Sequence, residues 1–535
     1  MKVLVADPIA RDGIERLRAE AEVDIIVGQT LPSLLTCIPS YDALVVRSET
    51  KVTAEVIEAG KRLKVIGRAG VGVDNIDVNA ATTHGILVVN SPGGNTIAAA
   101  EHTMALLLGL SRNVPQANAC LRAGGWDRAK FTGVEVLGKT LGVIGLGRIG
   151  SEVARRAQCF QMEVIAYDPF LSPDGASKLG VKLVSLEELV RTSDYITLHV
   201  PLSSETHHLI GERELSAMKK GVRIINAARG GIVDEAALCS ALKSGHVAGA
   251  ALDVFETEPL PLDSPLRDLP NVIVTPHLGA STKEAQVNVA VEVAEEVLAA
   301  LRGEPVRNAV NLPSVSREVL REIEPYLVLV EKMGRLLGYL AEGAVEKLEV
   351  LYSGEVAEKH TAFITLAALK GLLTPQLSEE VNLVSAPLIA RRRGLSVSER
   401  KTASSEGFGS LITAVASTAR GSHLVAGALF GTSEPRIVRV DEYRVDFEPF
   451  GHILIHWHDD RPGIIGAIGT ILGRNGINIA GLNLGRKARG ERAMAAVSVD
   501  DEVPAPVLQE IRNMDSIHDI KLVDLGAGFR APVND

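Results

Sequence analysis

The sequence contains little cysteine, no long hydrophobic run and no excess of positive charge. Its four cysteines, Cys37, Cys120, Cys159 and Cys239, are scattered and form no CxxC pair. This argues against a disulfide framework and a zinc site, and it predicts a reducing compartment and no bound metal. No apolar run reaches the ~18 residues that cross a bilayer, and the N-terminus begins directly with a strand pattern. We therefore expect a cytoplasmic, soluble protein without a membrane partner. The net charge of −10 disfavours a nucleic-acid partner.

The length of 535 residues exceeds what one hydrophobic core organises. At ~150 residues per domain it predicts three or four domains. Residues 1–94 alternate strand and helix patterns, and the alternation continues beyond residue 140, which favours α/β units with parallel sheets. Ser281 and Glu284 predict a capping box for a long helix that runs to about residue 302. The alternation stops at the Pro-, Asn- and Ser-rich segment 303–316, which is typical of a linker, and the next helix is predicted over residues 325–340. From residue 451 the order of patterns is β-α-β-β-α-β, which is typical of a ferredoxin-like unit.

A strand–turn–helix pattern between residues 138 and 169 predicts a dinucleotide site. The turn is GLGRIG, residues 145–150. Its first glycine permits the tight turn, the second lets the backbone approach a pyrophosphate, and the third lets helix pack on strand. Glycines also mark ordinary turns, but here Asp168 ends the next predicted strand at the spacing of an acid that binds a ribose diol. Because its charge would repel a 2′-phosphate, we predict NAD rather than NADP.

Two arginines follow predicted strands of the first 94 residues, Arg47 in VVRSET and Arg68 in VIGRAGVGVDN. Ligands of open α/β sheets bind beyond the carboxyl ends of the strands. Each arginine could therefore meet an anion or could be a solvated strand end, and position alone does not decide between the two.

Arg229, Glu258 and His277 lie at or just after predicted strand ends of the nucleotide-binding half. Oxidation of a secondary alcohol by NAD needs a base for the hydroxyl proton and a cation for the substrate. Imidazole titrates near neutral pH, so His277 suits the first role. Glu258 could fix its tautomer, and Arg229 offers a fork of donors for a carboxylate. Taken singly, such residues are more often structural, so the flanking sequences have to decide.

Those flanks resemble the D-isomer-specific 2-hydroxyacid dehydrogenase family. The matching segments are GLGRIG at 145–150, NAARGGIVDE at 226–235, ALDVFETEP at 251–259 and TPHLGAST at 275–282, and the similarity covers residues 1 to about 310. It implies Arg229 as substrate clamp, Glu258 as partner acid and His277 as acid/base. It also implies an NAD-binding domain, 95–282, inserted into a substrate domain of 1–94 and 283–310. The implied cofactor contacts are Gly145, Gly147, Arg148, Ile149, Gly150, Asp168, Ala227, Ala228, Arg229, Asp253, His277, Gly279 and Ala280.

Within the family the chain resembles the long members that carry two regulatory domains. These oxidise 3-phospho-D-glycerate (3-phosphoglycerate) to 3-phosphohydroxypyruvate, the first step of L-serine biosynthesis. RSETKV at 47–52 and GRAGVGVDN at 67–75 carry this resemblance. It implies substrate contacts by Arg47, Ser48, Arg68, Gly70 and Val71, and by Arg128 of a neighbouring subunit. Several guanidiniums suit a ligand with both a phosphate and a carboxylate.

The C-terminal segment HWHDDRPGIIGAIGTILGRNGINI at 456–479 resembles the amino-acid-sensing ACT domain. The resemblance implies that 451–526 form this domain and that His458, Asp460 and Asn478 bind L-serine across the interface of a homo-oligomer, a dimer or tetramer. Some relatives carry Asn in place of Asp460, and a purely structural module is the alternative. Residues 317–447 resemble the intervening regulatory domain of the same enzymes.

The sequence thus predicts an α/β protein with two Rossmann-like doubly wound parallel-sheet domains, an α+β intervening domain and a ferredoxin-like ACT domain. Two other functions stay open at this point. One is a different D-2-hydroxyacid dehydrogenase, such as a glyoxylate or hydroxypyruvate reductase. The other is an NAD-sensing protein without catalysis, against which the complete set of Arg229, Glu258 and His277 argues.

Overall fold

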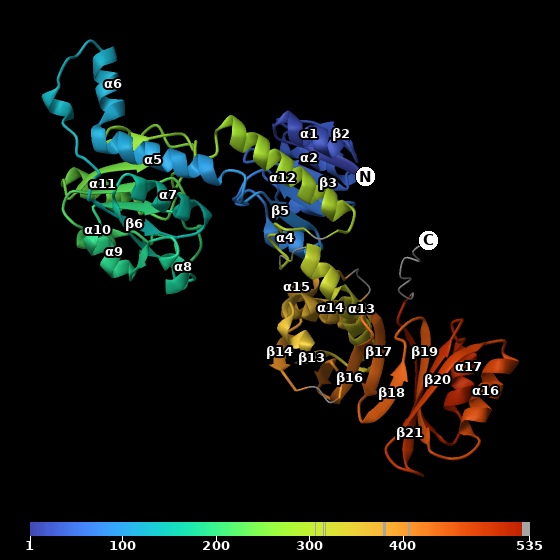
Figure 1. Cartoon of the computed structure of the whole chain (residues 1–535). Coiled ribbons are helices and arrows are strands. Elements are labelled where there is room, and N and C mark those ends of the chain that lie inside the picture. The colour runs from blue at the N-terminus through green and yellow to red at the C-terminus, as the bar shows by residue number, and fades with distance from the viewer. Residues whose placement is uncertain (305, 314, 316, 378–380, 405–406, 527–535) are drawn as a thin grey trace.

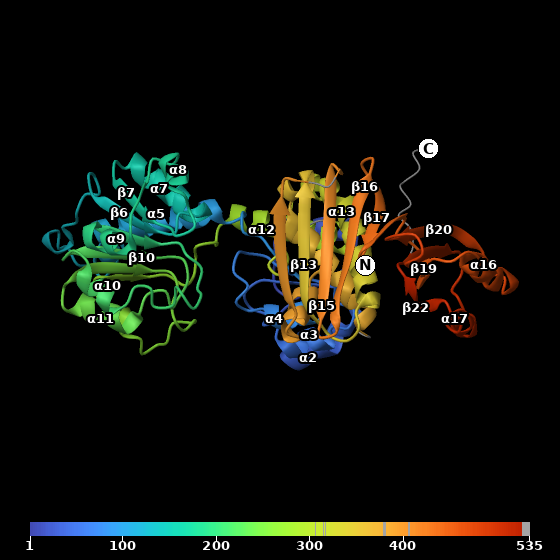
Figure 2. The ribbon, with the colours of Figure 1, turned by 90° about the horizontal axis from the view of Figure 1, so that it is seen from below.

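The computed structural model describes residues 1–304, 306–313, 315, 317–377, 381–404 and 407–526. Positions 305, 314 and 316 of the predicted linker region, and positions 378–380 and 405–406 of the predicted intervening domain, lie outside the described residues. Four sheets organise the described part of the chain, and each sheet with its helices is called a unit below. Figures 1 and 2 show the second unit at one end of the molecule and the fourth at the other, with the first and third between them.

The first unit is a parallel sheet in the order β2-β1-β3-β4-β5. Its central strand β3 is apolar and fully buried, as a strand covered on both faces must be. Helix α12 follows the second unit in sequence, yet Val289, Val293 and Val297 pack in the same hydrophobic cluster as β1 and β3. The strands are β1 (Lys2–Val5), β2 (Glu22–Ile25), β3 (Ala43–Val46), β4 (Val65–Arg68) and β5 (Leu87–Asn90), and the helices are α1 (Arg11–Arg18), α2 (Leu31–Cys37), α3 (Ala54–Ala59), α4 (Val78–Thr83) and α12 (Lys283–Leu301).

The second unit is a parallel sheet in the order β12-β11-β10-β9-β6-β7-β8. The direction of strand addition reverses between β6 and β9, and such a switch point opens a crevice beyond the carboxyl ends of the strands. The strands are β6 (Thr140–Ile144), β7 (Glu163–Tyr167), β8 (Lys182–Leu183), β9 (Tyr195–Leu198), β10 (Val222–Asn226), β11 (Val247–Leu252) and β12 (Val272–Val274), and the helices are α5 (Thr96–Arg112), α6 (Val114–Arg122), α7 (Arg148–Cys159), α8 (Pro173–Ser177), α9 (Leu186–Thr192), α10 (Glu212–Ala217) and α11 (Glu235–Lys243).

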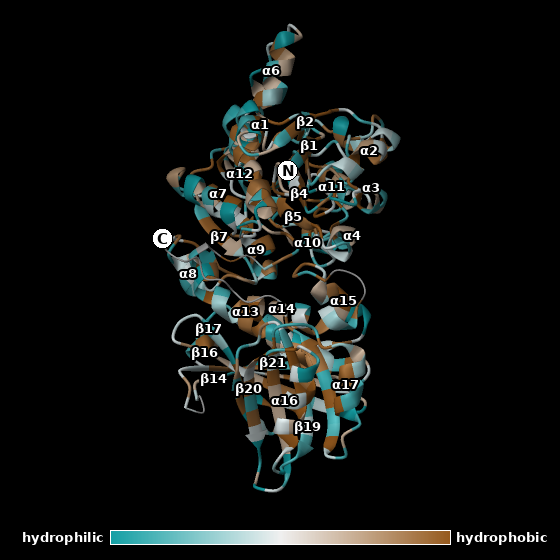
Figure 3. Cartoon of the chain, turned by 90° about the vertical axis from the view of Figure 1, so that its right-hand side faces the viewer, coloured by the Kyte–Doolittle hydropathy of each residue, from teal (hydrophilic) through white to brown (hydrophobic). Residues whose placement is uncertain are grey.

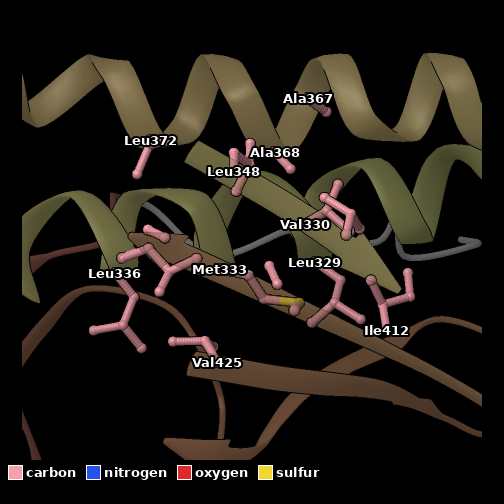
Figure 4. Packing of buried hydrophobic residues seen from close by; sticks show 14 of the residues in the cluster. Leu329, Val330, Met333, Leu336, Leu348, Ala367, Ala368, Leu372, Ile412 and Val425 are labelled. Carbon is pink, nitrogen blue, oxygen red and sulfur yellow. The ribbon is translucent and has the colours of Figure 1, made fainter. Parts of the chain in front are cut away.

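The third unit is a mixed sheet in the order β14-β13-β15-β16-β17-β18, covered by helices α13 and α14. Figure 4 shows Leu329, Met333 and Leu336 of α13 on the side of this helix that faces the strands, close to Val425 and Ile412. The strands are β13 (Val345–Gly354), β14 (Ser396–Thr402), β15 (Ser410–Thr418), β16 (Gly421–Phe430), β17 (Glu434–Val440) and β18 (Tyr443–Phe447), and the helices are α13 (Arg317–Leu340), α14 (Thr361–Leu373) and α15 (Ala386–Arg392).

The fourth unit is antiparallel, in the order β20-β21-β19-β22, and its element order is the predicted β-α-β-β-α-β. One face of its sheet carries α16 and α17. The opposite face, which includes Ile453, Ile455 and Met494, belongs to the same buried cluster as α13, so the third and fourth units share one hydrophobic core. The strands are β19 (His452–Asp459), β20 (Ile479–Arg486), β21 (Arg492–Val499) and β22 (Ile517–Asp524), and the helices are α16 (Ile464–Arg474) and α17 (Ala505–Arg512).

The predicted fold class is confirmed, but several elements differ from the sequence-based expectation. Helix α12 is capped by the hydroxyl of Thr282, which accepts from the amide of Ala285, and not by the expected box of Ser281 and Glu284. Helix α13 was expected to begin at Pro325. It begins eight residues earlier, at Arg317, because the preceding turns bury Ile323 in the core of the third unit.

Helix α6 was not expected, and it projects away from the second unit (Figures 1 and 3). Figure 3 shows hydrophobic as well as hydrophilic residues on this projection. Within the described ranges, no helix is both long enough and apolar enough to span a membrane.

Candidate active site

The glycine turn occupies the switch point of the second sheet. Gly145 follows β6 with φ +91°, and a Cβ there would lie 2.7 Å from the carbonyl oxygen of His199, at the end of β9. Gly150 is equally constrained, since its Cβ would lie 2.0 Å from the oxygen of Gly145. Gly147, by contrast, is exposed, and nothing lies within 4 Å of a Cβ built on it. The turn therefore packs tightly on its inner side and leaves an open backbone surface at the start of α7, where Arg148 and Ile149 follow. Such a surface fits a pyrophosphate.

Asp168 follows β7 and lies beside this turn. Its carboxylate accepts hydrogen bonds from the amides of Leu146, at 2.9 Å, and Phe170, at 2.9 Å. These bonds fix the carboxylate at the edge of the crevice while each oxygen keeps a lone pair for a ribose hydroxyl. The geometry fits the predicted contact with NAD.

We expect Asp168→Asn to weaken NAD binding roughly 10-fold or more, because a hydrogen bond to a charged acceptor contributes ~1.5–3 kcal/mol. Binding of NADP should improve relative to NAD, since the charge that repels a 2′-phosphate is gone. Dissociation constants for both dinucleotides, measured by calorimetry, check this. Asp174→Asn, in the nearby helix α8, is the matched control, and an unchanged ratio of the two constants in Asp168→Asn would contradict the prediction.

His277 and Glu258 form a pair beyond the ends of β11 and β12. The distance from His277 Nδ1 to Glu258 Oε2 is 2.8 Å, and the other carboxylate oxygen of Glu258 accepts from the amide of Phe255. The side chains are 49% and 38% exposed, so a ligand can reach the imidazole. Partial burial raises the pKa of Glu258, but the hydrogen bond and charge of His277 outweigh it and leave the pKa below its usual value. With Nδ1 bonded to this ionised partner, Nε2 is the atom that can exchange a proton with a ligand.

Asp253 is fully buried and holds the loop that carries His277. Its carboxylate accepts from the hydroxyl of Thr275 at 2.6 Å and from the amides of Leu278 and Gly279 at 2.7 and 2.8 Å. His277 itself adopts a left-handed conformation, φ +54°, and its amide donates to the carbonyl of Asp253. Asp253 was predicted to contact the cofactor, and the structure places its carboxylate inside the protein, where it orders the loop. Gly279 is buried and Ala280 is half-buried just after His277.

Arg229 follows β10 and reaches the first unit. Its Nη1 donates to the carbonyl of Ala228 at 2.6 Å, and its Nε lies 3.3 Å from the carboxylate of Asp74. A Cβ at Gly72 would lie 2.0 Å from Nη2 of Arg229, so a side chain at this position would displace the guanidinium. Asn226 bonds the backbone of this loop, which also contains Ala227, and thereby fixes the base of the arginine. The side chain is therefore presented to the space between the units.

Arg68, at the end of β4, lies close enough to Arg229 for the two positive charges to repel each other. It is largely buried, and its Nε has no partner among the described residues. Burial above all, together with the neighbouring guanidiniums of Arg229 and Arg47, lowers the pKa of Arg68 to about 10, against the opposing charges of Asp74 and Asp7. Such clustered, partly desolvated cations favour an anionic ligand.

Arg47 is held by groups that the sequence reasoning did not single out. Asp7, buried after β1, accepts from the amide of Arg47 at 2.6 Å and from the amide of Thr50. Asn75 donates to the carbonyls of Arg47 and Thr50 from the other side. A cavity of about 150 Å³ borders Arg47 and α12. The available signal for Asp7 was its place after β1, at the switch point of the first sheet, where ligand loops converge.

The other residues predicted to contact the substrate lie in different environments. Gly70 has φ +152°, and a Cβ there would lie 2.0 Å from Nη1 of Arg68. Val71 accepts from Asn90 through its carbonyl, and Ser48 is exposed. Arg128 lies on an exposed segment after α6, and it is not among the charges that act on Arg68. Figure 1 shows α6 at the end of the second unit remote from the first sheet, so a single chain does not bring Arg128 to the arginine group.

The predicted effector residues lie on the fourth unit. His458 belongs to strand β19, where it is buried beside His456 with ring centroids 4.8 Å apart. Asp460 accepts from the amide of Gly490 at 3.0 Å, and its carboxylate lies 3.3 Å from Arg486. Asn478, just before β20, donates to Asp500 at 2.6 Å. Asp460 and Asn478 thus have partners within the chain, whereas Nδ1 of His458 has none among the described residues.

The neighbouring His456 gives a testable pH effect. Both of its ring nitrogens lack a partner among the described residues, and burial lowers its pKa to about 3. Below pH 6.5 the unfolded chain gains a proton here that the folded chain does not. The free energy of unfolding therefore decreases as the pH is lowered below 6.5. We expect about 2 kcal/mol of loss between pH 6.5 and 5, from 1.36 kcal/mol per pH unit, and His456→Leu should remove it.

Urea unfolding at the two pH values, in a Trp126→Phe background that leaves Trp457 of β19 as the reporter, measures this loss. His360→Leu, at an exposed histidine before α14, is the control. An undiminished pH dependence in His456→Leu would contradict the assignment.

Comparison with known proteins identifies the family of each part. Residues 104–279 match the NAD-binding domain of D-isomer specific 2-hydroxyacid dehydrogenases. Residues 322–441 match the D-3-phosphoglycerate dehydrogenase intervening domain, and residues 452–515 match the ACT domain.

Relatives of full length are also found. The chain is 50% identical to the D-3-phosphoglycerate dehydrogenase of Archaeoglobus fulgidus, over 98% of this chain and 100% of that protein. It is 47% identical to the enzyme of that name from Methanocaldococcus jannaschii, again over 98% and 100%. The crystal structure of TT0316 protein from Thermus thermophilus is 40% identical, with a TM-score of 0.54, over 58% of this chain and 100% of that one. The similarity thus extends through both C-terminal units, which a simple reductase of the same family does not require.

Proposed function

Since the chain belongs to the D-isomer-specific 2-hydroxyacid dehydrogenase family, and within it to the D-3-phosphoglycerate dehydrogenases, we propose that Arg229, Glu258 and His277 form its catalytic centre. The enzyme oxidises 3-phosphoglycerate to 3-phosphohydroxypyruvate with NAD, the first step of L-serine biosynthesis. The observation that supports the proposed centre best is the bonded His277–Glu258 pair on the sheet edge that also presents Arg229.

His277 is the base in this proposal. Its Nε2 removes the proton of the C2 hydroxyl, and the ionised Glu258 stabilises the imidazolium through Nδ1. Arg229 binds the carboxylate beside C2 and so aligns the reacting carbon with the base. Because His277 is half-exposed, the imidazolium can return its proton to solvent after each turnover. NAD bound at the glycine turn would supply the acceptor for the hydride that leaves C2.

The NAD site fits the residues present. Gly145, Gly147, Arg148, Ile149 and Gly150 would hold the pyrophosphate, since the open backbone at Gly147 leaves room for it. Asp168 would bind the adenosine ribose. Ala227, Ala228, Arg229, His277, Gly279 and Ala280 would line the nicotinamide end, and Asp253 would act there by ordering the loop.

The phosphate end of the substrate is assigned to Arg68 and Arg47, with the backbone of Ser48, Gly70 and Val71. The desolvated guanidinium of Arg68, whose Nε has no partner among the described residues, supports this assignment. We also propose that Arg128 completes the site from a second copy of the chain. In support, the projecting segment around α6 exposes Val114, Leu121 and Trp126, the last at 81%, and an apolar surface of this kind is typical of a subunit interface.

The domain limits given above and the regulatory role of the C-terminal half complete the proposal. The packing of α12 with β1–β5 supports a discontinuous substrate domain of 1–94 and 283–310. L-Serine, the end product of the pathway, would bind at His458, Asp460 and Asn478 between ACT domains of two subunits. The shared core of 317–447 and 451–526 would transmit its binding as the movement of one body.

NADH formation from 3-phosphoglycerate tests the catalytic proposal. The same assay with unphosphorylated D-glycerate separates it from a glyoxylate or hydroxypyruvate reductase. We expect kcat/KM to fall by roughly 10³-fold or more without the phosphate, because charge-assisted bonds contribute ~1.5–3 kcal/mol each. Equal kcat/KM for both substrates would exclude the assignment of the arginines. Titration with L-serine, using Asn478→Ala as comparison, tests the effector site separately.

A further inference from the structure

His102 lies on helix α5, which begins just after the chain leaves the first unit. The helix packs on the second sheet in the same hydrophobic cluster as Leu141 and Ile225. The side chain of His102 is mostly buried, and its Nε2 lies 3.2 Å from Oδ1 of Asp253 and 3.3 Å from Oγ1 of Thr275. Neither the glycine motif nor the proposed catalytic set includes this residue.

The carboxylate of Asp253 requires such a neighbour. It is 0% exposed, and in the described part of the chain no lysine or arginine pairs with it. Its other partners are the neutral hydroxyl of Thr275 and the amides of Leu278 and Gly279. A buried carboxylate without a cationic or strongly polar partner is costly, so the imidazole of His102 is the side chain that can supply both a donor and a charge.

The same carboxylate determines the shape of the loop at 275–279. Its oxygens bond three groups of this loop, and the carbonyl of Asp253 accepts from the amide of His277. Since His277 adopts φ +54°, an uncommon conformation for a side chain with a Cβ, surrounding contacts have to hold it there. A shift of Asp253 would move His277 relative to Glu258.

We propose that His102 is a positioning residue for the oxidation reaction, which acts through Asp253 to keep the imidazole of His277 in place. The inference rests on the proposed role of His277. It predicts that loss of the His102 donor slows proton removal from substrate while the glycine turn and its dinucleotide contacts remain as they are.

Two substitutions of His102 test this in the full-length enzyme. His102→Phe keeps the ring volume without a donor and should lower kcat roughly 10–100-fold, the effect of one hydrogen bond to a charged group. KM for NAD should change less than threefold. The kinetic isotope effect on kcat with substrate deuterated at C2 should rise, because chemistry becomes slower than product release. His102→Gln, whose amide can donate to Asp253, should recover most of kcat.

Glu101→Gln is the matched control, since Glu101 is the preceding residue of α5 and faces Arg156 at 3.6 Å. A His102→Phe enzyme with unchanged kcat and isotope effect would overturn the inference. So would equal losses in His102→Phe and His102→Gln with equally lowered melting temperatures, because they would show a structural role only. A wild-type enzyme that forms no NADH from 3-phosphoglycerate would instead refute the proposed function.

Discussion

His277→Ala is expected to lower kcat for NADH formation from 3-phosphoglycerate by roughly 10²–10⁴-fold, the usual contribution of a general base. The substitution removes the group that accepts the C2 hydroxyl proton, and water in its place is neither oriented nor held by Glu258. Binding of NAD should change little, because Gly145, Gly147 and Gly150 lie at a different part of the sheet edge. Steady-state rates and calorimetric NAD affinities measure the two effects independently.

His208→Ala provides a close control. His208 is also partly exposed, also belongs to the second unit and also pairs with a glutamate, at 3.1 Å from Glu256. It lies outside the proposed catalytic centre, so its loss should leave kcat within about twofold. If His277→Ala retained wild-type kcat, the acid–base assignment would be wrong, whatever the effect on stability.

Glu258→Gln tests the second member of the pair. The pKa of Glu258 is lowered by its bond to His277, so the carboxylate stays ionised as pH falls to about its usual value of 4.5 and loses its charge only below it. We therefore expect Glu258→Gln to lower kcat roughly 10-fold or more at every pH from 5.5 upward, because the neutral amide cannot stabilise the imidazolium and a hydrogen bond to a charged group contributes ~1.5–3 kcal/mol. An unchanged kcat across this range would show that the charge of Glu258 does not act on His277.

The placement of Arg229, Glu258 and His277 at one edge of the second sheet could be predicted because each one follows a strand. Parallel strands align their carboxyl ends, so Arg229 after β10 and His277 after β12 had to meet at one edge. Asp74 and His102 could not be predicted in the same way. Asp74 reaches Arg229 across two units, at a residue separation of 155. His102 faces Asp253 from helix α5, whose Ala-rich and apolar sequence predicts only that it is mostly buried. Their roles depend on tertiary placement, which strand-end spacing does not encode.

In the C-terminal half, two features of the strands likewise depend on tertiary pairing and not on the local sequence pattern. Strand β14 is largely exposed, with polar side chains on both faces, so it lacks the alternation that marks a half-buried strand. The hydrogen bonds of β13 stabilise it instead. His458 belongs to β19, which continues to Asp459, just before the Pro-Gly turn, since pairing with both β21 and β22 extends this strand.

Arg68→Met should weaken binding of the substrate phosphate without weakening the fold. The methionine fills similar volume without charge. We expect kcat/KM for 3-phosphoglycerate to fall by roughly 10²–10³-fold, since a charge-assisted, partly buried contact is lost. The activity with D-glycerate should change little, because Arg229 still binds the carboxylate and His277 still accepts the proton of the C2 hydroxyl. Arg62→Met, at an exposed arginine paired with Asp42, is the control.

The same substitution should make the protein without substrate more stable. Folding lowers the pKa of Arg68 to about 10, which means that folding disfavours its charge by up to roughly 3 kcal/mol at neutral pH. Removing the charge should therefore raise the melting temperature of the unliganded enzyme and reduce the further rise that 3-phosphoglycerate produces. A lower melting temperature with undiminished stabilisation by substrate would mean that Arg68 supports the fold and does not bind the phosphate. The expected gain in stability without substrate and the expected loss of substrate binding follow from one cause. The cluster of Arg47, Arg68 and Arg229 is costly to the folded chain until a ligand with both a phosphate and a carboxylate neutralises it.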